Sequence, residues 1–270
     1  MVCQWPPADP AAPVTLGALQ GTGVTAVWPG GCDNRGMHLA LEWLPEQRPP
    51  PQLLILLHGL GGSGAAMRPL AEALRERFAQ AAIVAPDAPQ AADGGAPGRQ
   101  WFSVQGLDDT TRAARVAAAL GPLRDWVRAT QRRLGVDPQA TAIAGFSQGA
   151  ILALELAQAH DGLAGRVLAF AGRYARLPDV APRLTTLHLL HGAADDVIPA
   201  SHARVALQHL GVLHGDATLD IAQEVGHVLH PALIDSALHQ LTSHIPHRTW
   251  RAAMGAVPHA SATSHPADNA

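Results

Sequence analysis

The chain has 270 residues, 47% of them apolar and 15% charged, which suits one folded α/β domain and argues against a disordered or fibrous protein. A formal net charge of −3 argues against a broad basic surface for nucleic acid. All 19 basic residues are arginine, so lysine Schiff-base chemistry, a lysine P-loop and Ser-Lys catalysis are excluded.

Cysteine content and hydropathy bear on the compartment. The two cysteines, Cys3 and Cys32, lie near the N-terminus and predict neither a disulfide framework nor a Cys/His zinc pattern. The first residues lack the basic and apolar regions of a secretory signal, and no run reaches the roughly 18 apolar residues of a membrane helix. We therefore expect a cytoplasmic protein without a membrane span.

Apolar runs alternate with helical periodicity along most of the chain. The run Leu-Leu-Ile-Leu-Leu at 53–57 is continuous, which is typical of a strand buried on both faces. Residues 87–107 contain Gly and Pro without a period and predict a long functional loop. The expected strands cover residues 37–44, 53–57, 82–85, 141–144, 167–170, 186–190 and 218–221, and the expected helices cover 65–78, 109–134, 148–159, 199–210 and 231–241.

This alternation predicts a mostly parallel sheet with helices on both faces, in which reactive groups collect at the carboxyl ends of the strands. Residues 21–245 are expected to form a single domain. Residues 1–20 are rich in Pro and Ala and predict a flexible extension. Residues 246–270 turn to His, Ala, Pro and Ser without a pattern and predict a mobile tail.

A serine lies between two glycines in the sequence Gly-Phe-Ser-Gln-Gly at 145–149, directly after an expected strand and before an expected helix. A side chain at either glycine would clash in so sharp a turn. The turn exposes the hydroxyl of Ser147 and leaves amides at the helix N-terminus free to hold a developing oxyanion. This context indicates a catalytic nucleophile.

A serine nucleophile needs a base and an acid that orients the base. The loop after strand 186–190 supplies Asp195, and the loop after strand 218–221 supplies His227. The order Ser147, Asp195, His227 is that of the α/β-hydrolases. The alternatives stay open: His227 could be an ordinary loop histidine among 15, Asp195 could be a turn or helix-cap residue, and Asp196 could take the acid role.

The glycine-rich sequence at 58–64 follows strand 53–57. Its glycines allow the backbone to approach a substrate closely, so we expect the amides of Leu60 and Gln148 to form an oxyanion hole. A phosphate-binding loop is the alternative, which the absence of lysine disfavours. His58 is expected to brace this loop rather than to transfer a proton.

Four motifs together resemble the phospholipase/carboxylesterase family, which includes the acyl-protein thioesterases and small bacterial carboxylesterases. The similarity covers roughly residues 50–245, and the sequence Gly-Arg-Gln-Trp-Phe-Ser at 98–103 is most similar to the bacterial branch. The motifs are Leu-His-Gly-Leu-Gly-Gly at 57–62, Gly-Phe-Ser-Gln-Gly at 145–149, His-Gly-x-x-Asp-x-x-Ile-Pro at 191–199 and Gly-His at 226–227.

The resemblance implies a single-domain α/β-hydrolase without a large lid, which hydrolyses esters or thioesters without a cofactor. It implies Ser147 as nucleophile, Asp195 as acid, His227 as base, and Leu60 and Gln148 as oxyanion donors. Three positions depart from the family pattern, and none removes a catalytic group. They are Asp196 in place of a usual proline, Gly62 in place of a common aspartate and Ala144 in place of a glycine.

We interpret the chain as a serine carboxylesterase that acts on a small-molecule ester through an acyl-enzyme on Ser147. Trp101 and Phe102 would line the acyl or alcohol pocket, or else pack under their loop. An acyl thioesterase or lysophospholipase would use the same triad. A non-catalytic binding module is disfavoured because all three triad positions are filled, and a metal site at His227 and His230 lacks a third ligand at sensible spacing. The oligomeric state stays open.

Overall fold

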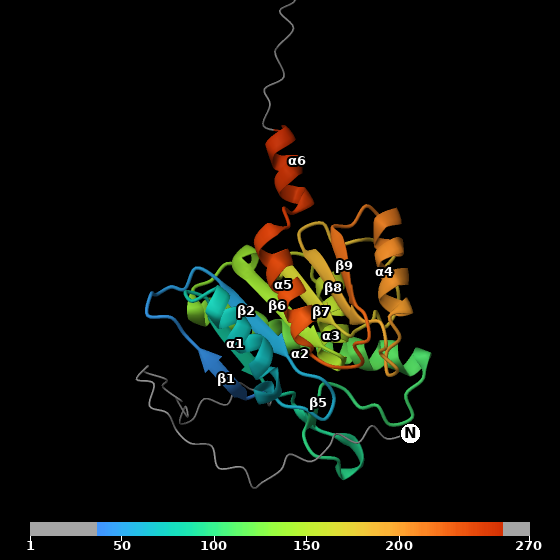
Figure 1. The fold of residues 1–270 in the computed structure, drawn as a ribbon. Coiled ribbons are helices and arrows are strands. Elements are labelled where there is room, and N and C mark those ends of the chain that lie inside the picture. The colour runs from blue at the N-terminus through green and yellow to red at the C-terminus, as the bar shows by residue number, and fades with distance from the viewer. Residues whose placement is uncertain (1–36, 256–270) are drawn as a thin grey trace, which may run out of the picture.

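The computed structural model describes residues 37–255, so the predicted extension at 1–20 and the end of the predicted tail lie outside the described residues. A seven-stranded sheet runs through the domain in the order β1-β3-β2-β6-β7-β8-β9 (Figure 1). Only β1 pairs antiparallel, with β3, and the remaining neighbours in this sheet are parallel. The mostly parallel sheet confirms the predicted fold class.

The strands and helices follow the predicted order closely. The strands are β1 (Leu39–Trp43), β2 (Leu53–Leu57), β3 (Ala82–Pro86), β4 (Gln90–Ala91), β5 (Arg99–Gln100), β6 (Thr141–Phe146), β7 (Arg166–Phe170), β8 (Thr186–Gly192) and β9 (Ala217–Ala222). The helices are α1 (Arg68–Arg77), α2 (Asp109–Leu134), α3 (Gln148–Ala159), α4 (Ser201–Val212), α5 (Pro231–Ser243) and α6 (His247–Gly255). Short 3-10 turns occur at Gly64–Met67, Asp93–Gly95 and Pro138–Ala140.

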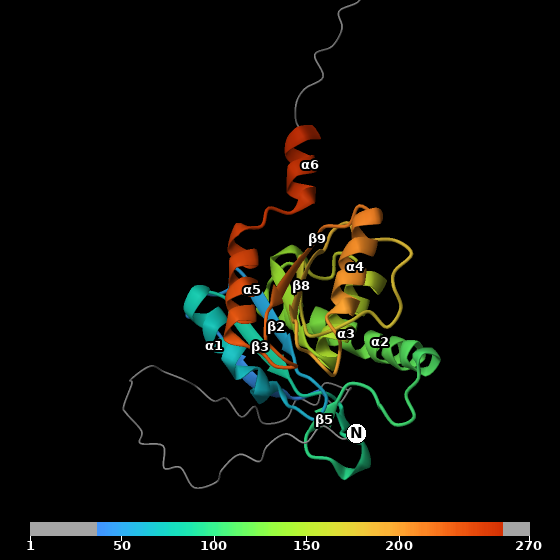
Figure 2. The ribbon, with the colours of Figure 1, turned by 45° about the vertical axis from the view of Figure 1, so that its right-hand side comes forward.

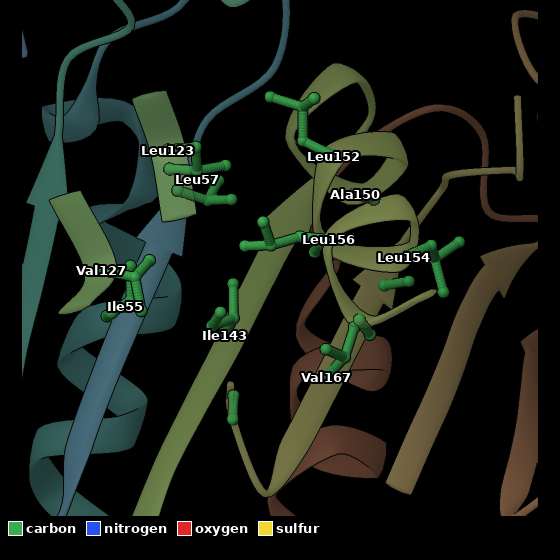
Figure 3. Close-up of a cluster of buried hydrophobic side chains, with 14 of the residues drawn as sticks. Ile55, Leu57, Leu123, Val127, Ile143, Ala150, Leu152, Leu154, Leu156 and Val167 are labelled. Atoms are coloured by element: carbon green, nitrogen blue, oxygen red, sulfur yellow. The ribbon is translucent and has the colours of Figure 1, made fainter. Parts of the chain in front are cut away.

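Helices cover both faces of the sheet, which explains the continuous apolar strands. On one face, Ile55 and Leu57 of β2 point toward Leu123 and Val127 of α2, and α3 packs beside them (Figure 3). Leu54 of β2 belongs to a second core cluster that includes buried residues of α1 and α5. Figure 2 shows α1 and α5 on one side of the sheet and α2 and α3 on the other. An alternating apolar and polar pattern along β2 would bury polar side chains in one of the two cores. This explains why every residue of β2 is apolar.

Local signals set both ends of α2, whose predicted bounds are confirmed. The carboxylate of Asp108 accepts a hydrogen bond from the Thr111 amide at 2.7 Å, and the Thr111 hydroxyl accepts one from the Asp108 amide at 2.9 Å. This reciprocal pair satisfies two amides that the first helical turn leaves free. The helix ends at Gly135, which adopts φ 67°, a left-handed conformation that favours glycine.

The long loop predicted at 87–107 lies at the carboxyl edge of the parallel strands. It contains the two-stranded sheet β4–β5, and an isolated bridge joins Arg99 to Gly62 of the glycine-rich loop. Within residues 37–255 no larger lid is inserted at this edge. None of the helices in the same range is long and apolar enough to cross a membrane.

Residues 247–255 of the predicted tail form helix α6, a helix that the sequence analysis did not predict, and the mobility of the tail stays a prediction. Figures 1 and 2 show α6 projecting from the domain beyond α5. None of these nine residues is buried, but the His247 amide donates to Asp216 at 3.1 Å and the Arg248 guanidinium donates to Thr186 at 2.9 Å. Polar contacts at the start of α6 thus anchor it, and apolar periodicity cannot reveal such contacts. The domain boundary at residue 245 stays a prediction.

A buried histidine lies close to this anchor, at the amino edge of the strands. His188 accepts a hydrogen bond from the Arg166 guanidinium at 2.9 Å, and its other ring nitrogen is 2.8 Å from the Thr218 hydroxyl. Burial lowers the pKa of His188 to about 3, and the positive charges of Arg166 and His244 add to this effect against the opposing charge of Asp216. His188 is therefore neutral in the folded protein at neutral pH.

We expect His188 to make the protein less stable as the pH falls from about 6.5 toward 3. In this range the unfolded chain binds a proton that folded His188 does not, which lowers the free energy of unfolding by up to about 1.4 kcal/mol per pH unit. His188→Gln keeps one acceptor and one donor but cannot be protonated. Its urea-unfolding free energy should fall less steeply than wild type between pH 8 and 4.5, and parallel curves would contradict this assignment.

Candidate active site

Ser147 lies at the sharp turn between β6 and α3. Its backbone has φ 53° and ψ −114°, a strained conformation for a residue with a side chain. A Cβ atom on Gly145 would overlap the carbonyl of Gly149, and a Cβ atom on Gly149 would overlap the carbonyl of Leu57. The predicted steric need for both glycines is therefore confirmed.

The structure brings the three predicted triad residues into one hydrogen-bonded chain. The ring nitrogens of His227 lie 2.8 Å from the Ser147 hydroxyl and 2.7 Å from the Asp195 carboxylate. A carboxylate can only accept, so Nδ1 of His227 carries the proton and Nε2 is left to accept from the serine. The Phe146 ring packs against the imidazole at 5.0 Å between centroids. This arrangement can accept the serine proton.

Asp195 is positioned by its own loop. Its side chain is fully buried, and Oδ1 accepts hydrogen bonds from the amides of Val197 at 2.9 Å and Ile198 at 2.8 Å. The other oxygen, Oδ2, is directed to His227. Asp196 is exposed. The geometry thus places Asp195, and not its neighbour, against the histidine.

His191 is a buried residue of this site to which the sequence analysis assigned no role. Its Nε2 atom donates to the Ile198 carbonyl at 2.7 Å and lies 3.4 Å from the Asp195 carboxylate. Burial lowers the pKa of His191, although the Ile198 carbonyl and Asp195 oppose this effect. A neutral His191 therefore braces the loop that carries Asp195. Its position at the start of the motif at 191–199 was the available signal.

The predicted oxyanion loop lies beside the serine. A Cβ atom on Gly59 would lie 3.3 Å from the Cβ atom of Ser147. The loop is held by hydrogen bonds of 2.9 Å from the Gly61 amide to the Arg99 carbonyl and from the Arg99 amide to the Gly62 carbonyl. Within the part of the chain that the structure describes, the amides of Leu60 and Gln148 have no protein acceptor. Both amides can therefore bind an external oxygen.

His58 and His230 hold backbone rather than forming part of the triad. The buried His58 ring is 2.7 Å from the Gly59 carbonyl and accepts from the Ala88 amide at 3.0 Å, which agrees with the expected bracing role. Burial lowers the pKa of His58 against opposing contributions from Gly59 and Asp87, so the ring is neutral when it accepts. His230 caps α5 by accepting a hydrogen bond at 3.2 Å from the amide of Ala232, the second residue of the helix.

Trp101 and Phe102 are almost fully buried under their loop, with 2% and 3% of their surfaces exposed. The Trp101 indole donates to the His58 carbonyl at 2.8 Å. Both aromatic residues also line a cavity of about 370 Å³ together with α2 residues that include Leu123, and Ser147 is not part of its lining. The structure thus gives both residues a packing role, and their contact with substrate stays a prediction.

The sequence profile of the phospholipase/carboxylesterase family matches residues 42–245. The chain belongs to this family. It is similar to Esterase YpfH of Escherichia coli strain K12, with 43% identity over 199 residues that cover 74% of this chain and 85% of the relative. Acyl-protein thioesterase 1 of Saccharomyces cerevisiae is 29% identical over 168 residues, which cover 56% of this chain and 74% of the relative.

A solved structure bears out the α/β-hydrolase fold of this family member. The crystal structure of esterase PE8 has 28% sequence identity and a TM-score of 0.67, and the match covers 75% of this chain and 97% of that chain. The predicted resemblance to the phospholipase/carboxylesterase family, which rested on short motifs, is therefore confirmed over most of the domain.

Substitutions at the two adjacent aspartates should differ sharply in effect. In Asp195→Asn the side-chain amide no longer stabilises the Nδ1–H tautomer of His227, and we expect kcat for p-nitrophenyl butyrate to fall by about 10⁴-fold. Asp196→Asn changes an exposed side chain and should leave kcat nearly unchanged. Equal losses, in variants whose circular dichroism matches wild type, would contradict the placement of the acid.

Proposed function

We propose that this family member is a serine carboxylesterase that hydrolyses carboxylic esters through an acyl-enzyme on Ser147. The observation that carries the proposal is the continuous chain of hydrogen bonds from Ser147 through His227 to the buried Asp195, at 2.8 and 2.7 Å. Family membership and the similarity to Esterase YpfH support the same activity.

In the acylation step, Ser147 Oγ attacks the ester carbonyl carbon while its proton passes to Nε2 of His227. The amides of Leu60 and Gln148 hold the negative oxygen of the tetrahedral intermediate, a contribution worth roughly 10²- to 10³-fold per donor. The bond to the alcohol oxygen then breaks, and His227 returns its proton to the leaving alcohol. The product of this step is an ester between the acyl group and Ser147.

Deacylation repeats these steps with water as the nucleophile. His227 removes a proton from water, which attacks the acyl carbon, and the same proton returns to Ser147 as the carboxylic acid leaves. Asp195 stabilises the imidazolium that forms in both halves of the reaction. Its two hydrogen bonds from Val197 and Ile198 keep it oriented throughout.

Acyl thioester or lysophospholipid hydrolysis is the second candidate, because the same triad serves all three substrates. It is favoured by the similarity to a protein named acyl-protein thioesterase 1. Hydrolysis of p-nitrophenyl esters from acetate to palmitate, alongside matched acyl thioesters, separates the candidates. A higher kcat/KM for the esters supports the carboxylesterase, and a higher kcat/KM for long-chain thioesters supports the thioesterase.

We propose a small-molecule ester as the substrate and a cytoplasmic location, and we propose that the reaction needs no cofactor. The triad and two amide donors can complete both half-reactions with water alone, which supports the last point.

Ser147→Ala should lower ester hydrolysis by about 10⁴-fold or more, because the acyl group loses its covalent attachment point. A fluorophosphonate probe should label wild type at one site per chain and should not label the variant. Ser236→Ala, which changes a half-buried serine of α5 that donates to the Ala232 carbonyl, is the matched control and should keep wild-type activity and labelling. Substantial hydrolysis by Ser147→Ala would rule out the acyl-enzyme.

A further inference from the structure

We propose that the side chain of Gln148 is a positioning residue that sets the separation of the two oxyanion donors, acting through Trp101. The inference rests on the proposed function, which assigns the oxyanion to the amides of Leu60 and Gln148. Those amides come from two loops that are far apart in the sequence. Their spacing is therefore a property of the contacts around the loops, which include the hydrogen bonds of the Gln148 side chain to the Trp101 amide and the Phe102 carbonyl.

Both polar atoms of the Gln148 side-chain amide are hydrogen-bonded to the backbone of the loop at 99–103. Its Oε1 atom accepts from the Trp101 amide at 2.7 Å, and its Nε2 atom donates to the Phe102 carbonyl at 2.8 Å. Gln148 is 4% exposed, so these two bonds are made without competition from bulk water. An amide group whose oxygen and nitrogen each have a partner in the loop can hold that loop in one place.

The indole of Trp101 continues this connection to the loop that carries Leu60. Its Nε1–H donates to the His58 carbonyl at 2.8 Å, and the two rings lie 5.3 Å apart between centroids. His58 is two residues before Leu60 in the chain. The connection therefore runs from Gln148, which provides one oxyanion amide, through Trp101 to the segment that contains Leu60, which provides the other.

The same loop also holds the far side of the glycine-rich segment. Arg99 exchanges backbone hydrogen bonds with Gly61 and Gly62, and its guanidinium donates to the carbonyls of Ala88 and Pro89. These bonds fix the loop but do not reach the serine turn. Within residues 37–255, Gln148 is the residue of the serine turn whose side chain makes hydrogen bonds to this loop.

Positioning matters here because the donors bind the transition state and not the ester. Displacement of a reacting or stabilising group by about 1 Å can cost on the order of 10²-fold in rate. An interaction that acts only in the transition state lowers kcat and leaves KM largely unchanged when it is removed. This signature separates a positioning role from general support of the fold.

The test compares two variants of buried glutamines. Gln148→Met keeps the backbone amide and the side-chain length but removes both hydrogen bonds to the loop. Gln131→Met is the matched control, because Gln131 is 5% exposed and donates to the Thr141 hydroxyl at 3.0 Å and the Leu163 carbonyl at 2.8 Å, away from the serine turn. Both variants lose buried hydrogen bonds, and only the first loosens the oxyanion donors.

We expect Gln148→Met to lower kcat for p-nitrophenyl butyrate by about 10- to 100-fold, with KM within about threefold of wild type. Inhibition by butylboronic acid, whose tetrahedral adduct on Ser147 places an oxygen between the two amides, should weaken by a similar factor. Gln131→Met should keep wild-type kcat and inhibition. The same kcat in both variants would overturn the proposal.

Trp101→Phe tests the second half of the connection and serves if Gln148→Met does not fold. It removes the donor to the His58 carbonyl and should also lower kcat with little change in KM. Because both substitutions interrupt one connection, the double variant should lose much less than the product of the two single losses. Independent, multiplicative losses would overturn the proposal.

Fluorophosphonate labelling distinguishes failure of the positioning role from failure of the proposed function. If wild type is labelled at Ser147 and only the variants behave differently from expectation, the positioning role is wrong and the proposed function stands. If wild type is neither labelled nor active on esters and thioesters, the proposed function is wrong and the positioning role falls with it.

Discussion

Close backbone contact at the carboxyl edge of the sheet is the constraint on which the site depends. Gly149 lies against the carbonyl of Leu57, and Gly192 lies against the carbonyl of Val225, so that a Cβ atom at either glycine would overlap its neighbour. The first contact brings the serine turn to the oxyanion loop, and the second brings the aspartate loop to the histidine loop. Larger residues would separate these loops and the groups that they carry.

The strain at Ser147 persists because neighbouring hydrogen bonds hold it. The Ser147 amide donates to the Phe170 carbonyl of β7 at 2.9 Å, and the Ser147 carbonyl accepts from the amides of Ala150 and Ile151 at 3.0 Å. The turn is thus secured to the next strand on one side and to the first turn of α3 on the other. A conformation that costs of order 1–3 kcal/mol needs such support, and it presents the hydroxyl to His227 in return.

Two Asp–His pairs, each with a buried aspartate, lie at opposite edges of the sheet, and their surroundings give them different roles. At the amino edge, Asp216 accepts from the Thr186 hydroxyl at 2.6 Å and pairs with His244 at 2.9 Å. Burial alone would raise the pKa of Asp216, but hydrogen bonds from Thr186, from the His247 amide and from His244 lower it. That pair anchors the C-terminal segment, whereas Asp195 and His227 face a serine hydroxyl. The nucleophile, more than the ion pair, distinguishes a candidate catalytic site.

The sequence by itself determined the fold class, the serine turn and the order of the triad, because each is set by short-range patterns. A continuous apolar run predicted β2, helical periodicity predicted α2, and two glycines marked Ser147. Only the tertiary structure decided between Asp195 and Asp196 and placed a helix at 247–255. It also showed that the side-chain amide of Gln148 is hydrogen-bonded to a loop about 47 residues away in the chain. These features depend on which distant groups meet after folding, and a pattern along one strand or helix does not contain that information.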